Sequence, residues 1–535
     1  MNLRRIAATV MLILLLVSLT ACGGEKETAF AFDITADPEN LDPQLAADSA
    51  SLLLLQNTLE GLMSYDKNGA LTLGAALSYT VSDDGMTYVF TLDEQARWVH
   101  RGSVYAPVTA HDFVFAFQRI FDAGTASPYI KEFMCLKNAD AVVAGEKPKE
   151  ALGIYASGTY ELTAELSYPF DGFLALTATT PAMPCNPTFF TGTEGKYGTN
   201  IKNMAFNGPF VLSAWKTGEY LTLKKNGYYH RASEVQPSRV VFYPIAEQQQ
   251  STVRFLEGAT DVMSVAGDRI EALVADGYGY EQFQDTTWAL VFNTNDPVFA
   301  SKNARLAFVR SFTNASYLHQ FPIWLKKAGA LVPPVITTGT QPYRQYAGLD
   351  ITLDYNPQTA RSHLDAALAE LELTRLPAIT MLCPQQEIFS FLMQYVQQTW
   401  QDDLSVFVGL ERKNAEEIAR LVKSGVFQVA LMPFRPDSDS VSEMLSQFAS
   451  DSPKNITGYS NENYDALLKA ATLADTQEEA TDYLVEAEQL LIEEGVILPF
   501  AYQTSFYAIS KDAQDIIISP FGGGLYFKYA TIAAQ

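Results

Sequence analysis

The sequence predicts a mixed α/β protein built from several domains. Stretches with the two-residue alternation of β-strands and stretches with the 3.6-residue period of amphipathic helices follow one another along the 535 residues. Such a chain is long enough for about three domains of ordinary size. Hydrophobic residues make up 48% of it, which favours a folded chain over a disordered one. The elements lack the regular strand–helix rhythm of a single parallel sheet or barrel, and this favours separate or interleaved domains.

The first residues have the form of a secretory signal of the lipoprotein type. Arg4 and Arg5 precede an apolar segment over 6–19, and small residues then lead to Cys22, which two glycines follow. The pattern resembles the bacterial lipobox, so we expect Cys22 to become the lipidated N-terminus. The apolar segment is shorter than the roughly 20 residues that cross a bilayer. Two alternatives remain: a transmembrane anchor, or a plain signal peptide in which Cys22 is not lipidated.

The charge balance disfavours nucleic acid as a partner. The chain has 61 acidic residues against 37 lysines and arginines, a net charge of −24, and it contains no basic run. Phosphate contacts need clustered Lys or Arg, so no nucleic-acid binding is expected. Anionic lipid head groups would repel this surface, which leaves membrane attachment to the lipid on Cys22. The simplest interpretation of the acidity is solubility.

Sequence motifs of common enzymes and metal sites are absent. No H-E-x-x-H, G-x-S-x-G, C-x-x-C or P-loop pattern occurs, and the five histidines have no metal-ligand spacing. Beyond Cys22, the widely spaced Cys135, Cys185 and Cys383 are expected to be buried free thiols, although one bridge among them stays open. We predict no catalytic site, no metal and no cofactor. A lipid-anchored hydrolase is the distant alternative, because a catalytic carboxylate pair needs only spatial proximity.

Several strands can be predicted from local alternation. Residues 87–92 (TYVFTL) alternate with β-branched and aromatic side chains. Similar patterns predict strands at 160–166, 220–223 and 239–245. A further strand is expected at 427–430, and an aromatic strand from Pro499 to Ile509.

Helix starts can be predicted from capping residues. Thr109 with Asp112 three positions later predicts an N-cap with an acidic N3 residue, and the apolar residues that follow lie on one helical face. Asn356-Pro357 opens another helix, with proline at its first position. Thr476 with an acidic residue three positions on forms a capping box for a helix that a glycine at 495 ends.

Short blocks also occur along the chain in a fixed order. They are 38–43 (PENLDP), 59–62 (LEGL), 65–69 (YDKNG), 84–90 (DGMTYVF), 96–98 (ARW), 107–114 (PVTAHDFV), 125–129 (TASPY), 207–210 (NGPF) and 459–465 (YSNENYD). Each block alone is weak evidence of a relationship, but the occurrence of all of them in the same order as in related proteins is strong evidence. Together they resemble the oligopeptide- and dipeptide-binding group of bacterial extracellular solute-binding proteins, family 5, over nearly the whole mature chain.

The resemblance implies a two-lobed, three-domain periplasmic-binding-protein-like fold of the family 5, or cluster C, type. Such a protein closes around a ligand in the cleft between its lobes and delivers it to the permease of an ABC importer. The mature protein is expected to be a monomer that is lipid-anchored on the outer face of the cytoplasmic membrane or faces the periplasm. The expected segments are a signal peptide (1–21), a tether (22–31), domain I in three parts (32–65, 187–287 and 499–535), domain II (66–186) and domain III (288–498).

The resemblance places the main expected ligand contacts in the segment 433–437 (PFRPD). Asp437 stands where oligopeptide-binding relatives pair an aspartate with the α-ammonium of the peptide, and a buried ammonium needs such a carboxylate. The plain alternative is a loop aspartate beside a helix start, but Ser440 and Glu443 already form a capping box there. The peptide main chain would pair in the manner of an added strand. The other expected contacts are Ala47, Asp48, Ser49, Tyr129, Trp288, Pro433, Phe434, Arg435 and Tyr502.

Several positions depart from the family pattern. Phe434 replaces a tryptophan, and Pro433 replaces a glycine and has no N–H to donate. Leu431 replaces an arginine, which removes a partner for a peptide carboxylate. Arg435 and Thr286 stand where some relatives have a cysteine pair. Arg435 is expected either to substitute for the arginine that Leu431 replaces or to attract an acidic ligand. Another solute in the same architecture therefore stays open: a nickel chelate, an oligosaccharide, haem or a signalling peptide.

Overall fold

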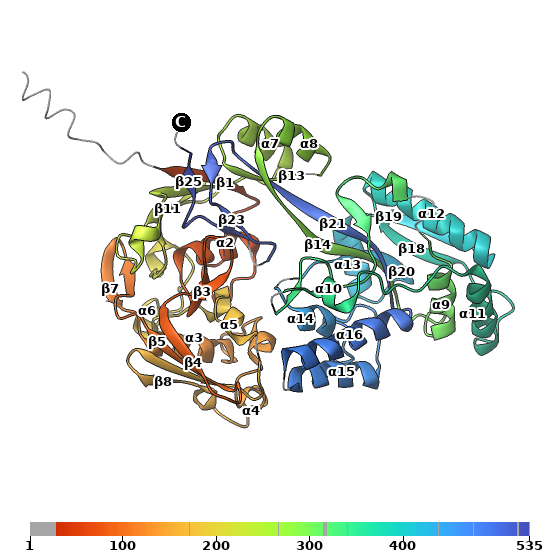
Figure 1. The fold of residues 1–535 in the computed structure, drawn as a ribbon, viewed down its shortest axis with the longest axis horizontal. Coiled ribbons are helices and arrows are strands. Elements are labelled where there is room, and N and C mark those ends of the chain that lie inside the picture. The colour runs from red at the N-terminus through yellow and green to blue at the C-terminus, as the bar shows by residue number, and fades with distance from the viewer. Residues whose placement is uncertain are drawn as a thin grey trace, which may run out of the picture.

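The computed structural model describes residues 28–533, apart from 171, 266, 314–317, 340, 437, 475 and 522–523. It has two lobes (Figure 1). Two long strands, β14 (Gly279–Phe292) and β21 (Ile497–Ile509), run between them. They pair antiparallel from Gly279 opposite Ile509 to Val291 opposite Ile497, and we call them the linking strands.

One 11-stranded sheet continues through both lobes. Its order is β10-β11-β12-β1-β13-β21-β14-β20-β18-β19, with β15 beside β21. The linking strands therefore stand in the middle of the sheet. The bounds of the other strands are β1 (Ala29–Ile34), β10 (Phe210–Lys216), β11 (Tyr220–Lys225), β12 (Arg239–Pro244), β13 (Val262–Val265), β15 (Leu325–Lys327), β18 (Ile379–Pro384), β19 (Val408–Lys413) and β20 (Val429–Phe434).

The first lobe adds a small antiparallel sheet and several short helices. The sheet has the order β4-β5-β9-β8, formed by β4 (Ala76–Val81), β5 (Thr87–Leu92), β8 (Ile154–Gly158) and β9 (Glu161–Glu165). The other elements are α2 (Ser49–Thr58), β2 (Met63–Tyr65), β3 (Leu71–Leu73), β6 (Arg97–His100), β7 (Ser103–Pro107), α3 (Ala110–Ile120), α4 (Ala139–Val143), α5 (Phe173–Leu176), α6 (Pro187–Gly192), α7 (Gln248–Leu256) and α8 (Ile270–Ala275).

The C-terminal segment returns to the first lobe. It forms β22 (Ala513–Gln514), β23 (Ile517–Ile518), β24 (Leu525–Tyr526) and β25 (Thr531–Ile532). One hydrophobic cluster includes residues from Phe30 to Val262 and again from Ala513 to Ala530. Because these two stretches share one core, the last residues hold the first lobe together although the second lobe precedes them in the chain.

The second lobe is a sheet covered by helices on both faces. On one face lie α9 (Lys302–Arg310), α11 (Pro357–Glu370) and α12 (Glu387–Leu404). On the other lie α10 (Tyr343–Ala347), α13 (Ala415–Lys423), α14 (Val441–Ser446), α15 (Glu462–Leu473) and α16 (Gln477–Glu493), with the short strands β16 (Thr337–Thr338) and β17 (Gln341–Pro342) beside α10. Helices α10 and α14 are on the side that faces the first lobe (Figure 1).

Strand β14 supplies both cores of the second lobe. Leu290 and Phe292 pack into the cluster under α9, α11 and α12. Ala289 and Val291 pack into the cluster under α13 to α16. This alternation follows from the two-residue period of a strand, and it explains why this part of the sequence is almost wholly apolar.

The local predictions are largely confirmed. The predicted strands correspond to β5, β9, β11, β12 and β21, with boundary shifts of a few residues at most. Thr109 and Asp112 form the expected capping box of α3, and the side chain of Asn356 accepts a hydrogen bond from Thr359 N at the start of α11. Cys135, Cys185 and Cys383 are free and buried, as expected.

Two local predictions need correction. The strand expected at 427–430 begins at Val429 and continues to Phe434, because that stretch pairs with β14, while Asn293 Nδ2 holds the carbonyl of Phe427. In the predicted capping box, the Ser440 hydroxyl does accept from Glu443 N. The Glu443 carboxylate, however, accepts from the N–H and hydroxyl of Ser438.

A buried ionic cluster joins distant segments of the first lobe. The carboxylate of Glu60 accepts from the Tyr229 hydroxyl, from Arg231 Nη2 at 3.2 Å and from His230 Nε2 at 2.7 Å. His230 Nδ1 lies 2.6 Å from Asp93 Oδ2. Both ring nitrogens face carboxylates, so both donate and the ring is an imidazolium. Burial lowers the pKa of His230, but the hydrogen bonds and charges of Glu60 and Asp93 outweigh this and raise it.

Candidate functional site

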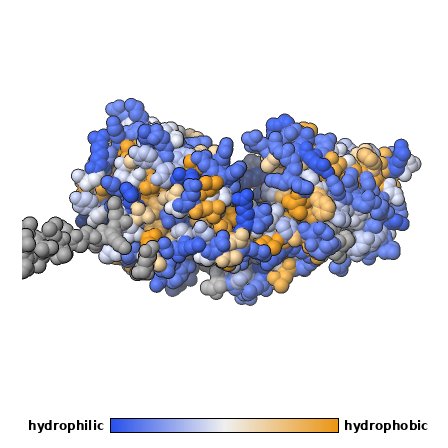
Figure 2. All heavy atoms as spheres, turned by 90° about the horizontal axis from the view of Figure 1, so that it is seen from above, coloured by the Kyte–Doolittle hydropathy of each residue, from blue (hydrophilic) through white to orange (hydrophobic). Residues whose placement is uncertain are grey.

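The candidate site lies between the two lobes, where the space-filling surface is notched (Figure 2). The linking strands cross this region, and α10 and α14 border it from the second lobe (Figure 1). From the first lobe, the turn between β23 and β24 reaches across. Phe521 in this turn packs against the second-lobe cluster under α13 to α16.

The linking strand β14 carries three buried polar atoms that have no hydrogen-bond partner in the described part of the chain. They are Gln284 Nε2, Asp285 Oδ2 and Thr287 Oγ1. The register of β14 against β21 shifts between Gln284 and Thr286, so Asp285 stands at a bulge, a feature that re-aims side chains. Buried polar atoms are nearly always satisfied by protein or water. Asp285 Oδ2 is contacted by a guanidinium, so Gln284 Nε2 and Thr287 Oγ1 remain as the exceptions among the described residues of this strand, and they mark an unusually polar stretch of a central strand beside the gap.

Arg435 binds the aspartate at this bulge. Its Nη2 is 3.0 Å from Asp285 Oδ2, with Asp285 1% exposed and Arg435 48% exposed. The other carboxylate oxygen accepts from the hydroxyls of Ser505, at 2.9 Å, and Thr286, at 3.1 Å. Arg435 Nη2 also donates to the carbonyl of Pro520 at 3.3 Å. The guanidinium, carried by the residue that follows β20, therefore contacts a linking strand and the first lobe at once.

Asp439 is a second carboxylate facing the gap. It accepts from Thr337 N at 2.7 Å and from the Thr337 hydroxyl at 2.5 Å. The side chain is exposed to water, yet the surrounding protein desolvates it and raises its pKa. This combination is expected of a carboxylate in a narrow gap. Burial and, to a smaller extent, the charge of Asp439 raise the pKa of Tyr65 in the first lobe.

Strand β20 has a free edge next to these groups. It pairs with β14 from Val429 to Phe434 but with β18 only at Val429 and Ala430. Beyond Ala430, no strand of the described chain pairs with its other edge. An extended ligand can add to such an edge through main-chain hydrogen bonds. Pro433, which is exposed there and opposite Trp288 on β14, has no N–H to contribute.

Three large aromatic side chains predicted as ligand contacts are buried: Trp288, Phe434 and Tyr502. Phe434 packs on Phe448 with ring centroids 5.5 Å apart. Trp288 packs on Phe389 at 4.1 Å and donates its Nε1–H to Gln503 Oε1 at 2.7 Å. Tyr502 is buried on β21 directly opposite Thr287, so its side chain is on the same face of the sheet as the orphaned Thr287 hydroxyl.

The predicted contacts from the first lobe have local structural partners. Asp48 caps α2, with Oδ1 accepting from Ser51 N at 2.8 Å. Ala47 and Ser49 beside it are exposed. The hydroxyl of Tyr129 donates to the carbonyl of Ala46. Asp437 and Cys22 lie outside the described residues, so their predicted roles stay predictions.

Sequence reasoning missed Gln284, Asp285, Thr287 and Asp439. A signal for the first three was present. The polar run 284–287 (QDTT) directly precedes the apolar run 288–292, and such a run inside a central strand is unusual. Asp439 gave no such signal, because an aspartate before a helix is common in loops.

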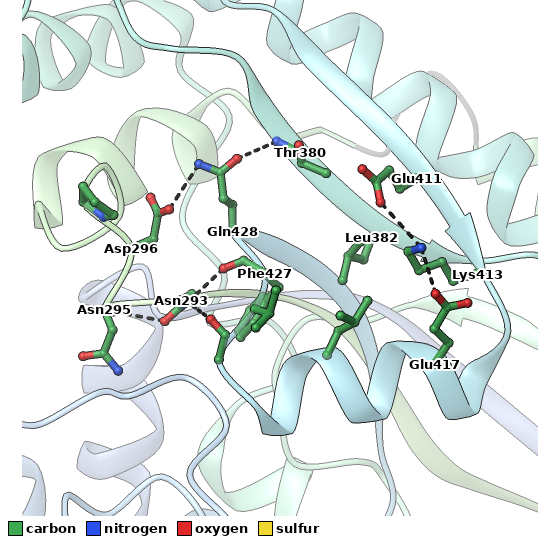
Figure 3. Close-up of a pocket in the computed structure, with 14 residues that line it drawn as sticks. Asn293, Asn295, Asp296, Thr380, Leu382, Glu411, Lys413, Glu417, Phe427 and Gln428 are labelled. Carbon is green, nitrogen blue, oxygen red and sulfur yellow. Dashed lines mark hydrogen bonds and ion pairs between the residues drawn. The ribbon is translucent and has the colours of Figure 1, made fainter.

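A groove of about 550 Å³ lies elsewhere in the second lobe (Figure 3). Gln428 crosses it, accepting from Thr380 N at 2.8 Å and donating to Asp296 Oδ2 at 3.2 Å. Lys413 lies between Glu411, at 3.8 Å, and Glu417, at 2.9 Å. The polar side chains of this groove thus connect strands and loops of the second lobe to one another. The orphaned polar atoms on β14 make the gap between the lobes the stronger candidate.

The described residues include no group of three or more His, Cys, Asp or Glu arranged to hold a metal ion. None of the helices in that part of the chain has the length and apolarity of a membrane span.

Comparison with known proteins decides the family. The model of the bacterial extracellular solute-binding proteins, family 5 (middle), matches residues 70–455. The chain belongs to this family. The predicted resemblance is thereby confirmed, and the relatives of this family 5 protein are solute-binding proteins rather than enzymes.

Relatives extend the match to nearly the whole chain. The oligopeptide-binding protein OppA of Bacillus subtilis is 26% identical over 98% of this chain and 98% of its own. The dipeptide-binding protein DppE of the same organism is 25% identical over 91% of this chain and 89% of its own. The structure of Listeria monocytogenes OppA bound to peptide has a TM-score of 0.75 and 26% identity, and covers 96% of this chain and 100% of that one. The predicted α/β, periplasmic-binding-protein-like fold of this family 5 protein is confirmed.

Proposed function

We propose that this family 5 protein is the extracellular, lipid-anchored binding component of an ABC importer, which captures short peptides between its lobes and delivers them to the permease. It acts as a monomer, without catalysis or a cofactor. The observation that carries the proposal is the edge of β20 that no strand of the described chain covers beyond Ala430, next to buried polar atoms of β14 that have no hydrogen-bond partner among the described residues. The relatives named as oligopeptide- and dipeptide-binding proteins support the peptide as the ligand.

The ligand would be held by main-chain pairing and by charges at its ends. Its backbone adds to β20 beyond Ala430, where Pro433 interrupts the row of donors. Asp437 receives the α-ammonium, between Arg435 and Asp439, whose side chains reach the gap. Waters fill the room around the peptide side chains, which allows varied sequences. The remaining expected contacts are Ala47, Asp48, Ser49, Tyr129, Trp288, Phe434 and Tyr502.

The lipid would attach the protein beside its permease, on the outer face of the cytoplasmic membrane or facing the periplasm. Acyl chains contribute about 0.8 kcal/mol per buried methylene, so the two or three chains on Cys22 give a firm anchor. The domain division into a first lobe of domains I and II and a second lobe of domain III is part of the same proposal.

The function is tested by identifying what the protein carries. We expect native mass spectrometry of protein purified without denaturation to release short peptides. After unfolding and refolding without ligand, a mixture of short peptides should raise the melting temperature, because a ligand at about 100 times its Kd stabilises the native state by about 2.7 kcal/mol. Recovery of only a sugar, a metal chelate or haem would refute the peptide while leaving the fold intact.

A further inference from the structure

Two strands from different lobes lie end to end along one edge of the linking strand β21. Strand β13 of the first lobe pairs with residues 506–509, and β15 of the second lobe pairs with residues 501–503. Thr504 lies between these two stretches, and its N–H donates to the carbonyl of Trp324 at 2.8 Å. The other edge of β21 pairs with β14. The lobes therefore meet on the edge of β21 that is turned away from β14.

The side chain of Trp324 packs against both lobes at this meeting point. It is partly buried against the first-lobe cluster formed by α7, β13, α8 and the end of β21. It also packs against the second-lobe cluster under α9, α11 and α12, where its ring centroid is 6.2 Å from that of Phe389. One aromatic side chain thus contacts hydrophobic clusters of both lobes beside the linking strands.

Gly267 is the first-lobe residue on which this side chain rests. It lies two residues beyond β13 and begins the short helical turn Gly267–Arg269. A Cβ atom added to Gly267 would lie 2.5 Å from Cγ and Cδ1 of Trp324 and even closer to its Cβ, far inside van der Waals contact. Only glycine allows such a close approach. We call this contact between Trp324 and Gly267 the seat.

The seat and the gap lie on opposite sides of the linking strands. In the sheet, β13 and β15 flank β21, whereas β20, whose end borders the gap, flanks β14. In Figure 1, α8 lies above the linking strands, and α10 and α14 lie below them. When two halves turn about strands that join them, opening the front brings the back together. Because the seat is already in close contact, the ring of Trp324 opposes further opening of the gap.

Given the proposed function, we propose that Trp324, seated on Gly267, limits how far the two lobes open and thereby sets the affinity for the peptide. The apparent Kd is the intrinsic Kd divided by the fraction of molecules in the binding-competent arrangement. A contact that excludes widely open arrangements therefore tightens binding without touching the ligand. Trp324 and Gly267 are positioning residues in this inference, and their effect on lobe opening holds whatever the ligand is.

Two variants are expected to change peptide binding in opposite directions. Trp324→Ala empties the seat, so we expect a larger radius of gyration without ligand and about 3- to 10-fold weaker binding of a pool of short peptides. Gly267→Ala adds a methyl group behind the linking strands and disfavours opening. We expect it to give a smaller radius of gyration and about 3- to 10-fold tighter binding. Small-angle X-ray scattering and calorimetry on the protein from Gly23 onward measure both effects.

Matched variants separate the seat from general stability. Gly227 is an exposed glycine of the first lobe with nothing within 4 Å of an added Cβ atom, so Gly227→Ala should change neither measurement. Trp215→Ala removes a partly buried tryptophan from β10, at the far end of the sheet, and should lower the melting temperature without changing affinity. Trp324→Phe keeps a smaller ring and should lie between the wild type and Trp324→Ala. A general loss of stability cannot weaken binding in one seat variant and tighten it in the other.

The outcomes distinguish this inference from the proposed function. Unchanged radii of gyration in both seat variants, or shifts of both in the same direction, would overturn the role of Trp324. Opposite shifts in the radius of gyration without a change in peptide affinity would overturn its link to binding. If the radii shift as expected but neither the wild type nor any variant binds peptide, the limit on opening stands and peptide capture is refuted.

Discussion

Replacing His230 with glutamine is expected to lower the free energy of unfolding by about 3–5 kcal/mol, the usual effect of removing one member of a buried ion pair. The imidazolium lies between Glu60 and Asp93 and its side chain is 2% exposed. Glutamine can replace at most part of the hydrogen bonding and none of the charge. Chemical unfolding of the protein, followed by tryptophan fluorescence, measures the difference.

The same variant should change the pH dependence of stability. The pKa of His230 is raised in the folded state, so its contribution is complete below the unfolded value of about 6.5 and is lost as pH rises through the folded pKa. The pKa values of Glu60 and Asp93 are lowered, despite burial, by their bonds to His230, so their contributions are lost as pH falls through the folded values. Between these limits, above about pH 4.5 and below about 6.5, the cluster should be most stabilising.

We therefore expect the wild type to lose stability from about pH 6.5 upward, and the His230→Gln variant to lack this part of the slope. The exposed His319 provides a matched control, because His319→Gln removes a histidine without touching the cluster. A variant that kept the wild-type slope would contradict the assignment of an imidazolium to His230.

Replacing Asp437 with alanine is expected to weaken binding of peptides with a free amino terminus by about 3–5 kcal/mol, roughly a hundred- to several thousand-fold. In the sequence, Asp437 is two residues from Arg435 and from Asp439, both of which border the gap. If Asp437 is the partner of the ammonium, its removal leaves that charge desolvated without a countercharge. Calorimetry with a free-amine peptide measures the loss.

An N-acetylated peptide makes this prediction specific. It lacks the ammonium, so the wild type should bind it weakly and Asp437→Ala should weaken it little further, which isolates the pairwise interaction. The exposed Asp451 in another loop of the same lobe serves as the control position for loss of negative charge. Equal effects of Asp437→Ala and Asp451→Ala on the free-amine peptide would exclude a direct contact.

Local signals in the sequence predicted local structure well. Thr109 and Asp112 are three residues apart and satisfy each other at the start of α3, so their pattern alone is sufficient. Strand β20 shows the limit. The sequence predicts a strand near it, but its pairing with β14 decides its length, and that partner is more than a hundred residues away. Local propensity does not contain this information.

The buried polar groups of the first lobe and of the candidate site were harder to predict for the same reason. The sequence shows five scattered histidines, and nothing local distinguishes His230 from the others. Its partners Glu60 and Asp93 are 170 and 137 residues away. Arg435 was predicted as a contact from the resemblance, whereas its partner Asp285 is found only once β14 and β20 are paired.

The central claim is that the two lobes close over a peptide, and small-angle X-ray scattering tests it most directly. The protein should first be unfolded and refolded without ligand, and then measured with and without a saturating pool of free-acid peptides. We predict that the radius of gyration falls when peptide is added, and that the change disappears at peptide concentrations far below the Kd. An unchanged radius of gyration, in samples where calorimetry shows that peptide is bound, would contradict closure of the lobes.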